Sequence, residues 1–211
     1  MMLSGAFGPL GDEKYSEYCT DIRESGSFLL RIISDILEMA RLEARRIEID
    51  REPLELATIV AETLEVYGPD AERNGIAVAI EADADVALSA DRQAVRQVLF
   101  NLFSNAVKFT PAGGTIRIGT SRRSDGALIV VEDTGIGIPQ AALAKLGRPF
   151  EQVQSPLTRS HKGSGLGLAI SRSLVALHGG EMDIVSEEGA GTRVTVFLPF
   201  RPASASRASA A

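Results

Sequence analysis

The hydrophobic pattern of this 211-residue chain changes its period after Gly75, and that change limits the folds that the chain can adopt. Up to about residue 68, apolar residues recur at spacings of three, four and seven, as in amphipathic helices. After Gly75 they alternate with small or polar residues, as in half-buried strands. The strands come in consecutive pairs, which favours antiparallel pairing. The pattern predicts an α/β fold: a two-layer α/β sandwich with a mixed, mostly antiparallel sheet and helices on one face, preceded by a helical-bundle helix.

The expected elements follow from this period and from residues that start or stop helices. Asp91 is expected to cap a helix, and Gly68 with Pro69 is expected to end one. The expected helices cover residues 15–47, 54–68, 91–110, 140–146 and 164–177. The expected strands cover residues 76–80, 86–89, 116–118, 128–131, 181–186 and 192–198. The break at residues 50–53 predicts a domain boundary, and the low-complexity residues 201–211 predict a disordered tail.

Composition excludes several classes of function. A net charge of -6 disfavours nucleic acid as a partner, because a polyanion requires a basic face. A single cysteine, Cys19, excludes an internal disulfide framework and a cysteine-based metal site. The chain has no apolar run of ~18 residues and no visible secretory signal. We therefore expect a cytoplasmic domain, although a full-length parent could be anchored in a membrane.

The first motif that carries chemistry is a polar face on the helix at residues 91–110. Asn101, Asn105 and Lys108 are spaced by four and three residues, so their side chains share one face. Amide oxygens are suitable ligands for Mg²⁺, and the lysine offers a point charge to phosphate. An ordinary solvated helix surface would explain this motif equally well if it stood alone.

The second motif follows an apolar strand at residues 128–131. Asp133 precedes Gly135 and Gly137 in the sequence DTGIG. A buried carboxylate needs a hydrogen-bond donor, and the exocyclic amine of adenine would supply one. The glycines would allow the backbone to approach a flat ring. Alone, the motif also fits a simple turn between a strand and a helix.

The third motif is the run of alternating glycines that opens the helix at residues 164–177. Gly163, Gly165 and Gly167 flank Ser164 and Leu166, which is neither a Walker A loop nor a dinucleotide fingerprint. Free N–H groups at a helix start favour an anion such as a di- or triphosphate. A glycine-rich helix cap is the alternative.

A long segment joins the second and third motifs. Residues 147–165 carry Arg148, Arg159, His161 and Lys162 in an otherwise acidic chain. Loops longer than about 12–15 residues without structure are usually functional. The segment therefore suits a lid over ATP, with a solvated loop as the alternative.

In this order and spacing, the three motifs resemble the ATP-binding fold of sensor histidine kinases, DNA gyrase, Hsp90 chaperones and the mismatch-repair protein MutL. The resemblance covers residues 54–200. It implies that Asn101 and Asn105 form an asparagine box, with Asn105 as the Mg²⁺ ligand and Asn101 close by. It also implies that Asp133 holds the adenine amino group of ATP, and that Lys108 contacts phosphate.

The same resemblance assigns further residues to nucleotide binding. Phe150 stands at the phenylalanine box of the family, and Gly163, Gly165 and Gly167 stand in its second glycine box. Gly191 and Thr192 match a late G-x-T motif whose threonine lies near the adenine.

One position indicates the kinase branch of this family. The gyrase, chaperone and MutL branches carry a catalytic glutamate four residues before the metal-binding asparagine, where this chain has Asn101. An amide has no useful basicity, so the site suits phosphoryl transfer better than hydrolysis. Residues 27–46 look like the second helix of a kinase dimerisation domain. Residues 7–22 resemble the turn region of PleC-, DivJ- and PdhS-type kinases, the cell-cycle sensor kinases of alphaproteobacteria.

The resemblance implies a division of the chain. Residues 1–52 would be a partial dimerisation and histidine-phosphotransfer domain, and residues 53–200 the catalytic ATP-binding domain. The acceptor helix with its histidine motif is missing, and neither His161 nor His178 is a credible acceptor. The chain would therefore be a fragment, or it would phosphorylate a histidine on another polypeptide.

The implied partners are a histidine-bearing dimerisation helix, the receiver domain of a response regulator and, in the full-length protein, a second copy. The alternatives are a non-catalytic, nucleotide-gated module that docks a response regulator and a protein-serine kinase of the anti-sigma type. The upstream helix counts against the last of these.

Overall fold

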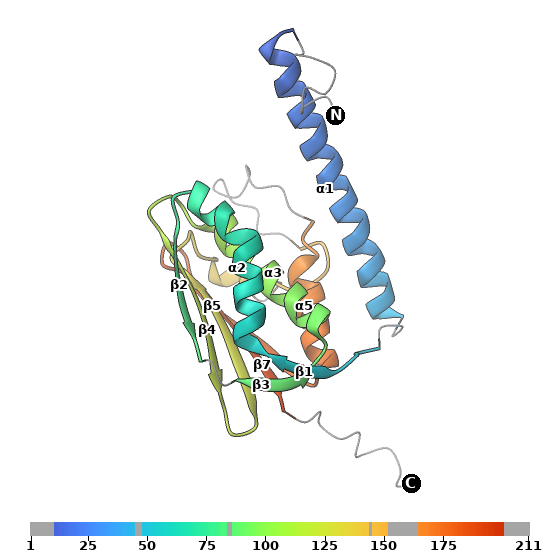
Figure 1. Ribbon diagram of the computed structural model, residues 1–211, viewed down its shortest axis with the longest axis vertical. Coiled ribbons are helices and arrows are strands. Elements are labelled where there is room, and N and C mark those ends of the chain that lie inside the picture. The colour runs from blue at the N-terminus through green and yellow to red at the C-terminus, as the bar shows by residue number, and fades with distance from the viewer. Residues whose placement is uncertain (1–10, 45–47, 84–85, 144, 152–163, 201–211) are drawn as a thin grey trace.

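The computed structural model (Figure 1) has a long helix, α1, beside a two-layer sandwich of helices and strands. It describes residues 11–44, 48–83, 86–143, 145–151 and 164–200. The expected tail at residues 201–211 lies outside these ranges, as does most of the segment expected to form a lid.

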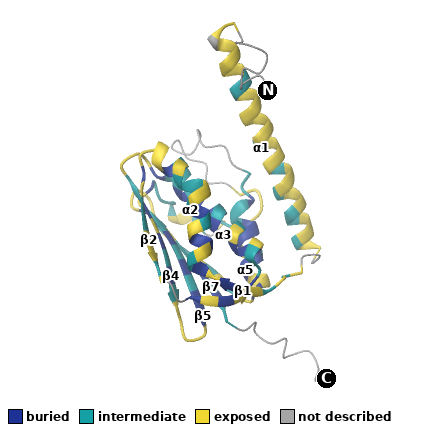
Figure 2. Ribbon diagram, viewed as in Figure 1, coloured by how far each residue is buried: buried dark blue, intermediate teal, exposed yellow. Residues whose placement is uncertain are grey.

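Helix α1 spans Glu13–Glu43 and begins at Asp12, whose side chain accepts a hydrogen bond from the Lys14 N–H at 2.9 Å. One stripe of α1 is half-buried against the sandwich, where it packs mainly on α5. Most of the rest is exposed, as Figure 2 shows. The exposed side includes large apolar side chains: Ile22, Leu29, Leu30, Ile33, Ile36 and Leu37. Among the described residues, no helix is long and apolar enough to cross a membrane.

Five strands form the main sheet in the order β2-β4-β5-β7-β6. Their bounds are Ala77–Ala82, Thr115–Arg122, Gly126–Asp133, Gly191–Pro199 and Glu181–Glu187, in that order. β2 and β4 are parallel and the other neighbours are antiparallel. β1 (Glu52–Glu55) and β3 (Ala87–Ala90) form a separate antiparallel pair. The expected mixed, mostly antiparallel sheet is confirmed.

Three helices cover one face of this sheet: α2 (Leu56–Arg73), α3 (Arg92–Phe109) and α5 (Gly167–Leu177). The core lies between the layers, where Phe103 of α3 and Ile118 of β4 are completely buried. The opposite sheet face carries an ion-paired cluster in which Glu132 bonds Arg117 and Arg193. This division into an apolar inner face and a polar outer face confirms the expected two-layer sandwich. α4 (Gln140–Leu143) is a single short turn.

The structure corrects four of the expected elements. β1 is a strand where we expected a break and a helix start, and Pro53 fits there because a two-stranded sheet leaves an edge without a ladder donor. α2 continues through Pro69 to Arg73, because its last turn buries Ala71 completely. α5 begins at Gly167 rather than at residue 164. β2 lies at the sheet edge, so Ile80 is exposed rather than half-buried.

Candidate functional site

A cavity of about 400 Å³ opens between the helical layer, one end of the main sheet and α1. This volume falls in the range of about 300–1,000 Å³ that is usual for small-molecule sites. It brings together residues from all three sequence motifs, which are far apart in the chain. The predicted site residues that line it are Asn101, Asn105, Lys108, Asp133, Gly137, Ser164, Gly165, Gly167 and Thr192.

Asn105 reaches the cavity from the last turns of α3, where helical periodicity places it one turn beyond Asn101. Its side chain is half-buried, and no other residue that the structure describes hydrogen-bonds to it. Its side chain lines the cavity, and an amide oxygen is the kind of ligand that Mg²⁺ accepts.

Asn101 has a different role in the structure. Its side chain is buried, and its Nδ2 donates to the Gly167 carbonyl at 3.0 Å and to the Ser171 Oγ at 3.2 Å. These bonds lock α3 to the first turn of α5. A Cβ on Gly167 would lie 3.3 Å from the Asn101 amide, so the glycine permits this close packing.

Lys108 is half-buried at the edge of the cavity. Burial lowers the pKa of its ammonium group, and the positive charge of Arg31 on α1 lowers it further. Both causes disfavour the charged form of the lysine. A phosphate in the cavity would reverse that balance, because an opposite charge favours the ammonium ion.

Asp133 ends β5 and faces the cavity. Its Oδ1 accepts a hydrogen bond from the Gly135 N–H at 2.8 Å. Burial raises the pKa of this carboxyl, an effect that the backbone N–H groups of Gly135 and Thr192 oppose and the charge of Glu132 reinforces. A half-buried carboxylate that keeps further acceptor capacity suits an amine donor on a ligand.

The glycines beside Asp133 are required by protein contacts. A Cβ on Gly135 would lie 2.5 Å from the Phe109 carbonyl oxygen and 2.7 Å from the Asp133 Oδ1. Gly137 has a φ of +65°, and a Cβ there would overlap the Glu187 carbonyl oxygen. The sequence suggested that these glycines allow a flat ring to approach. The structure shows a second reason for these glycines, which is close packing of the chain on itself.

Ser186, which no sequence motif indicates, supports this end of the cavity. Its Oγ lies 2.9 Å from the Thr192 Oγ1, donates to the Gly191 carbonyl at 2.7 Å and accepts from the Ile138 N–H at 2.9 Å. It therefore joins β6, β7 and the loop after β5. The pairing depends on strand register, which no local motif indicates.

The second glycine motif reaches the cavity just before α5. Gly165 has a φ of +71°, and the Ser164 Oγ accepts from the Leu166 N–H at 3.2 Å. The Leu166 side chain is completely buried in the core and does not line the cavity. Ser164 also donates to the Asp35 carboxylate of α1 at 2.8 Å.

The remaining predicted site residues do not meet at the cavity in the described part of the chain. Phe150 is 63% exposed, has a φ of 64° and does not line the cavity. Arg159, Lys162 and Gly163 lie outside the described residues.

One wall of the cavity was not expected at all, because it comes from α1. Phe28, Arg31, Ile32 and Asp35 of this helix line the cavity together with the sandwich residues. Their spacing of three, one and three residues is ordinary for one face of a helix, so the sequence offered only the pattern of a packing surface.

The donors in the cavity are compatible with a metal that is held largely by its ligand. Among the described residues, no three His, Cys, Asp or Glu side chains gather as a metal site. Asn105 offers a hard oxygen, and Mg²⁺ usually keeps several waters and binds through few protein groups plus phosphates.

Comparison with known proteins identifies what this arrangement is similar to. Residues 90–202 match the family described as histidine kinase-, DNA gyrase B- and HSP90-like ATPases. The histidine protein kinase DivJ of Caulobacter vibrioides is 42% identical over 201 residues, which are 94% of this chain and 33% of DivJ.

Two solved structures share the fold. The crystal structure of full-length ShkA in complex with AMPPNP has a TM-score of 0.79 and 34% identity, over 96% of this chain and 42% of that one. The histidine kinase ThkA in complex with the response regulator TrrA has a TM-score of 0.71 and 25% identity, over 92% of this chain and 53% of that one. The chain thus spans only part of the proteins it matches. The predicted resemblance to histidine kinases of the DivJ type is confirmed.

Proposed function

Because this chain belongs to the histidine kinase-, DNA gyrase B- and HSP90-like ATPase family, we propose that it is the ATP-binding catalytic domain of a two-component sensor histidine kinase. The observation that carries the proposal is Asn101. A hydrolase of this fold needs a base at that position, and Asn101 is an amide held between α3 and α5 by two hydrogen bonds. The site can hold ATP for transfer, but it has no group there to activate water.

The proposed nucleotide position follows the cavity from one end to the other. The adenine amine donates to Asp133 near Thr192, and the phosphates extend toward Lys108 and the N–H groups at Gly165 and Gly167. Arg159, Lys162 and Gly163 would add contacts from the segment between the motifs. Phe150 belongs to the same proposed lid.

Mg²⁺ would be held by Asn105, with Asn101 close by, and by the phosphates themselves. When bound, the ion neutralises charge on the phosphates and orients them. Because the Asn101 side chain is buried whereas that of Asn105 is only half-buried, Asn105 is the better placed of the two ligands.

The proposed reaction moves the γ-phosphoryl group from ATP to a histidine nitrogen. The lone pair of the neutral imidazole forms a bond to the γ-phosphorus. At the same time the bond between that phosphorus and the β–γ bridging oxygen breaks, and this oxygen leaves with ADP. This chain positions the nucleotide and offsets its charge. The one histidine among the described residues, His178, is buried and uses both ring nitrogens in hydrogen bonds, so His178 is not the acceptor, and we propose that the acceptor lies on another segment or chain.

The partners are proposed from the same family. We place the acceptor histidine on a dimerisation helix, so that residues 1–52 are part of the dimerisation domain and residues 53–200 are the catalytic domain. The exposed apolar side of α1 suits packing against such a helix and a second copy. The ThkA–TrrA complex supports a response regulator as the next partner. A domain that uses ATP as its substrate would operate on the cytoplasmic side of any membrane.

Calorimetry with AMPPNP tests the nucleotide site. The wild type should bind in the presence of Mg²⁺, and Asn105→Ala should weaken binding at least about tenfold. Asn74→Ala is the matched control, since Asn74 lies exposed at the end of α2. Failure of the wild type to bind would overturn the proposal.

A second assay tests transfer. The chain is mixed with radiolabelled ATP and a separate dimerisation domain that carries an intact acceptor histidine. Acid-labile label on that domain indicates a kinase. Nucleotide binding without any label would favour the nucleotide-gated docking module instead.

A further inference from the structure

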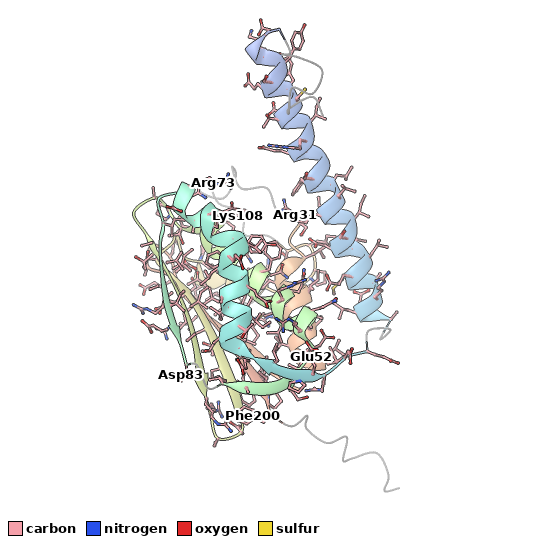
Figure 3. The ribbon with its side chains drawn as sticks, viewed as in Figure 1. Arg31, Glu52, Arg73, Asp83, Lys108 and Phe200 are labelled. Atoms are coloured by element: carbon pink, nitrogen blue, oxygen red, sulfur yellow. The ribbon has the colours of Figure 1, made fainter. Side chains whose placement is uncertain are left out.

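The nucleotide cavity is closed on one side by α1, and Arg31 is the cation of that wall. In Figure 3 the labelled Arg31 lies on the side of α1 that faces the sandwich, at the same height as Lys108. Arg31 is exposed, so its guanidinium reaches the cavity from the solvent side. The sandwich alone would leave this side of the cavity open.

A hydrogen bond fixes α1 at this level. The Ser164 Oγ of the glycine motif donates to the Asp35 Oδ2 at 2.8 Å, which ties α1 to the loop before α5. Arg31 stands one helical turn before Asp35, so the bond sets where the guanidinium lies. Packing of α1 on α5 reinforces this position.

The same bond engages the carboxylate that would be expected to pair with Arg31. Asp35 follows Arg31 by four residues, a spacing at which opposite charges commonly pair on a helix. Here the carboxylate accepts from Ser164 instead, and none of the ion pairs among the described residues includes Arg31. The guanidinium packs 5.7 Å from the centre of the Phe28 ring, on the cavity wall.

Two cations therefore converge on one cavity of a chain whose net charge is -6. Arg31 lies close enough to Lys108 to help lower the pKa of the lysine. An anion that lies near both cations is attracted by each of them. A di- or triphosphate supplies such an anion, and a guanidinium binds phosphate oxygens with two parallel donors.

We propose that Arg31 of α1 binds the phosphates of the nucleotide, so that α1 completes the site that the sandwich only partly encloses. This inference rests on the proposed function of the cavity. It assigns α1 a role in nucleotide binding in addition to packing. The bound nucleotide would then link α1 to the sandwich through its phosphates.

Calorimetry on the whole chain tests the inference with two ligands, AMPPNP and adenosine. Arg31→Ala should weaken AMPPNP binding about tenfold and leave adenosine binding unchanged, because adenosine has no phosphate. Arg31→Lys keeps the charge and should recover part of the loss. Arg23→Ala is the matched control, an exposed arginine of α1 that does not line the cavity, and should bind both ligands like the wild type.

The outcomes distinguish a failure of the role proposed for Arg31 from a failure of the proposed nucleotide site. Equal AMPPNP affinity in the wild type and Arg31→Ala would overturn the role of Arg31 while leaving the nucleotide site intact. An equal loss for AMPPNP and adenosine would also overturn it, because the effect would then be structural. If the wild type bound neither ligand, the proposed function would fail and the inference with it.

Discussion

The two ends of α3 differ in how their polar groups are used. At the N-terminal end, the Asp91 carboxylate accepts from the N–H groups of Ala94 and Asp50, and its own N–H donates to the His178 Nε2. At the C-terminal end, Asn105 and Lys108 face the cavity. We call these the anchored end and the cavity end.

The anchored end also holds the segment that enters from α1. Arg51 donates to the Ser89 carbonyl and to the His178 carbonyl, each at 3.0 Å. β1, β3, α3 and α5 therefore meet around one buried imidazole. A precise site needs support of this kind behind it. We expect substitutions at the anchored end to change the free energy of unfolding, and substitutions at the cavity end to change ligand binding.

The largest expected effect is a loss of stability at a residue of the cavity wall. It would be an exception to the expectation that substitutions near the cavity change ligand binding rather than the free energy of unfolding. Gly137→Ala should lower the free energy of unfolding by about 3 kcal/mol or more, since the left-handed φ of +65° disfavours alanine and the new Cβ would overlap the Glu187 carbonyl. Gly189→Ala is the control, with a φ of +82° and no atom within 4 Å of the new Cβ. Its cost should be about 1 kcal/mol. Urea denaturation measures the free energy of unfolding of both variants. Equal losses would show that the cavity wall shifts to accommodate the new Cβ, and the prediction would then be wrong.

The next effect is on binding. Asp133→Asn should weaken AMPPNP binding about 100-fold, because the Asn oxygen would pair with the Gly135 N–H and its NH₂ would meet the donor of the adenine amine. Stability should not fall, since burial raises the pKa of Asp133, so that its ionised form is less favourable in the folded chain than in the unfolded one. Asp125→Asn, in the exposed turn between β4 and β5, is the control. Unchanged affinity in Asp133→Asn would show that the adenine assignment is wrong.

The candidate site could be predicted where its polar residues form short motifs in the sequence. Asn105, Lys108 and Asp133 stand out because their spacing and their neighbours can be seen locally. Ser186, Arg31 and Asp35 could not be found this way. They reach the site through strand register and through packing of α1, and both depend on contacts between distant segments.

The fold class was predictable for a similar reason, because the apolar period indicates helices and strands directly. The errors arose where tertiary contacts override local signals. Pro69 stays inside α2 because the turn beyond it buries Ala71, and Pro53 is accepted in β1 at a sheet edge. Asn101 lines the cavity, and its amide nitrogen also joins two helices, a contact that the motif did not indicate.

A smaller effect is expected at the anchored end. His178→Phe should lower the free energy of unfolding by about 2 kcal/mol, because the Asp91 N–H would lose its buried acceptor. His178→Gln offers an amide oxygen and should lose less. AMPPNP affinity of both folded variants should match the wild type. A variant that kept its stability but lost affinity would show that the two ends are not independent.

The smallest effect concerns pH and separates the charge of His178 from its packing. Burial lowers the pKa of the imidazole below its ordinary 6.5, the positive charge of Arg51 lowers it further, and the Leu174 carbonyl and Asp91 oppose the shift. The unfolded chain therefore binds a proton at a higher pH than the folded one. As pH falls below 6.5, the wild type should lose stability by up to about 1.4 kcal/mol per pH unit, until the folded imidazole also titrates.

His178→Phe cannot titrate at this position, so its stability should fall less steeply over the same pH interval. The raised pKa of Asp133 has the opposite sign and acts in both proteins, so it cancels in their difference. Urea midpoints measured in half-unit steps between about pH 5 and 7.5 give that difference directly. Parallel curves would mean that the folded imidazole titrates normally. In that case the anchored end would be held by packing and the Asp91 carboxylate, and the neutral imidazole would not contribute.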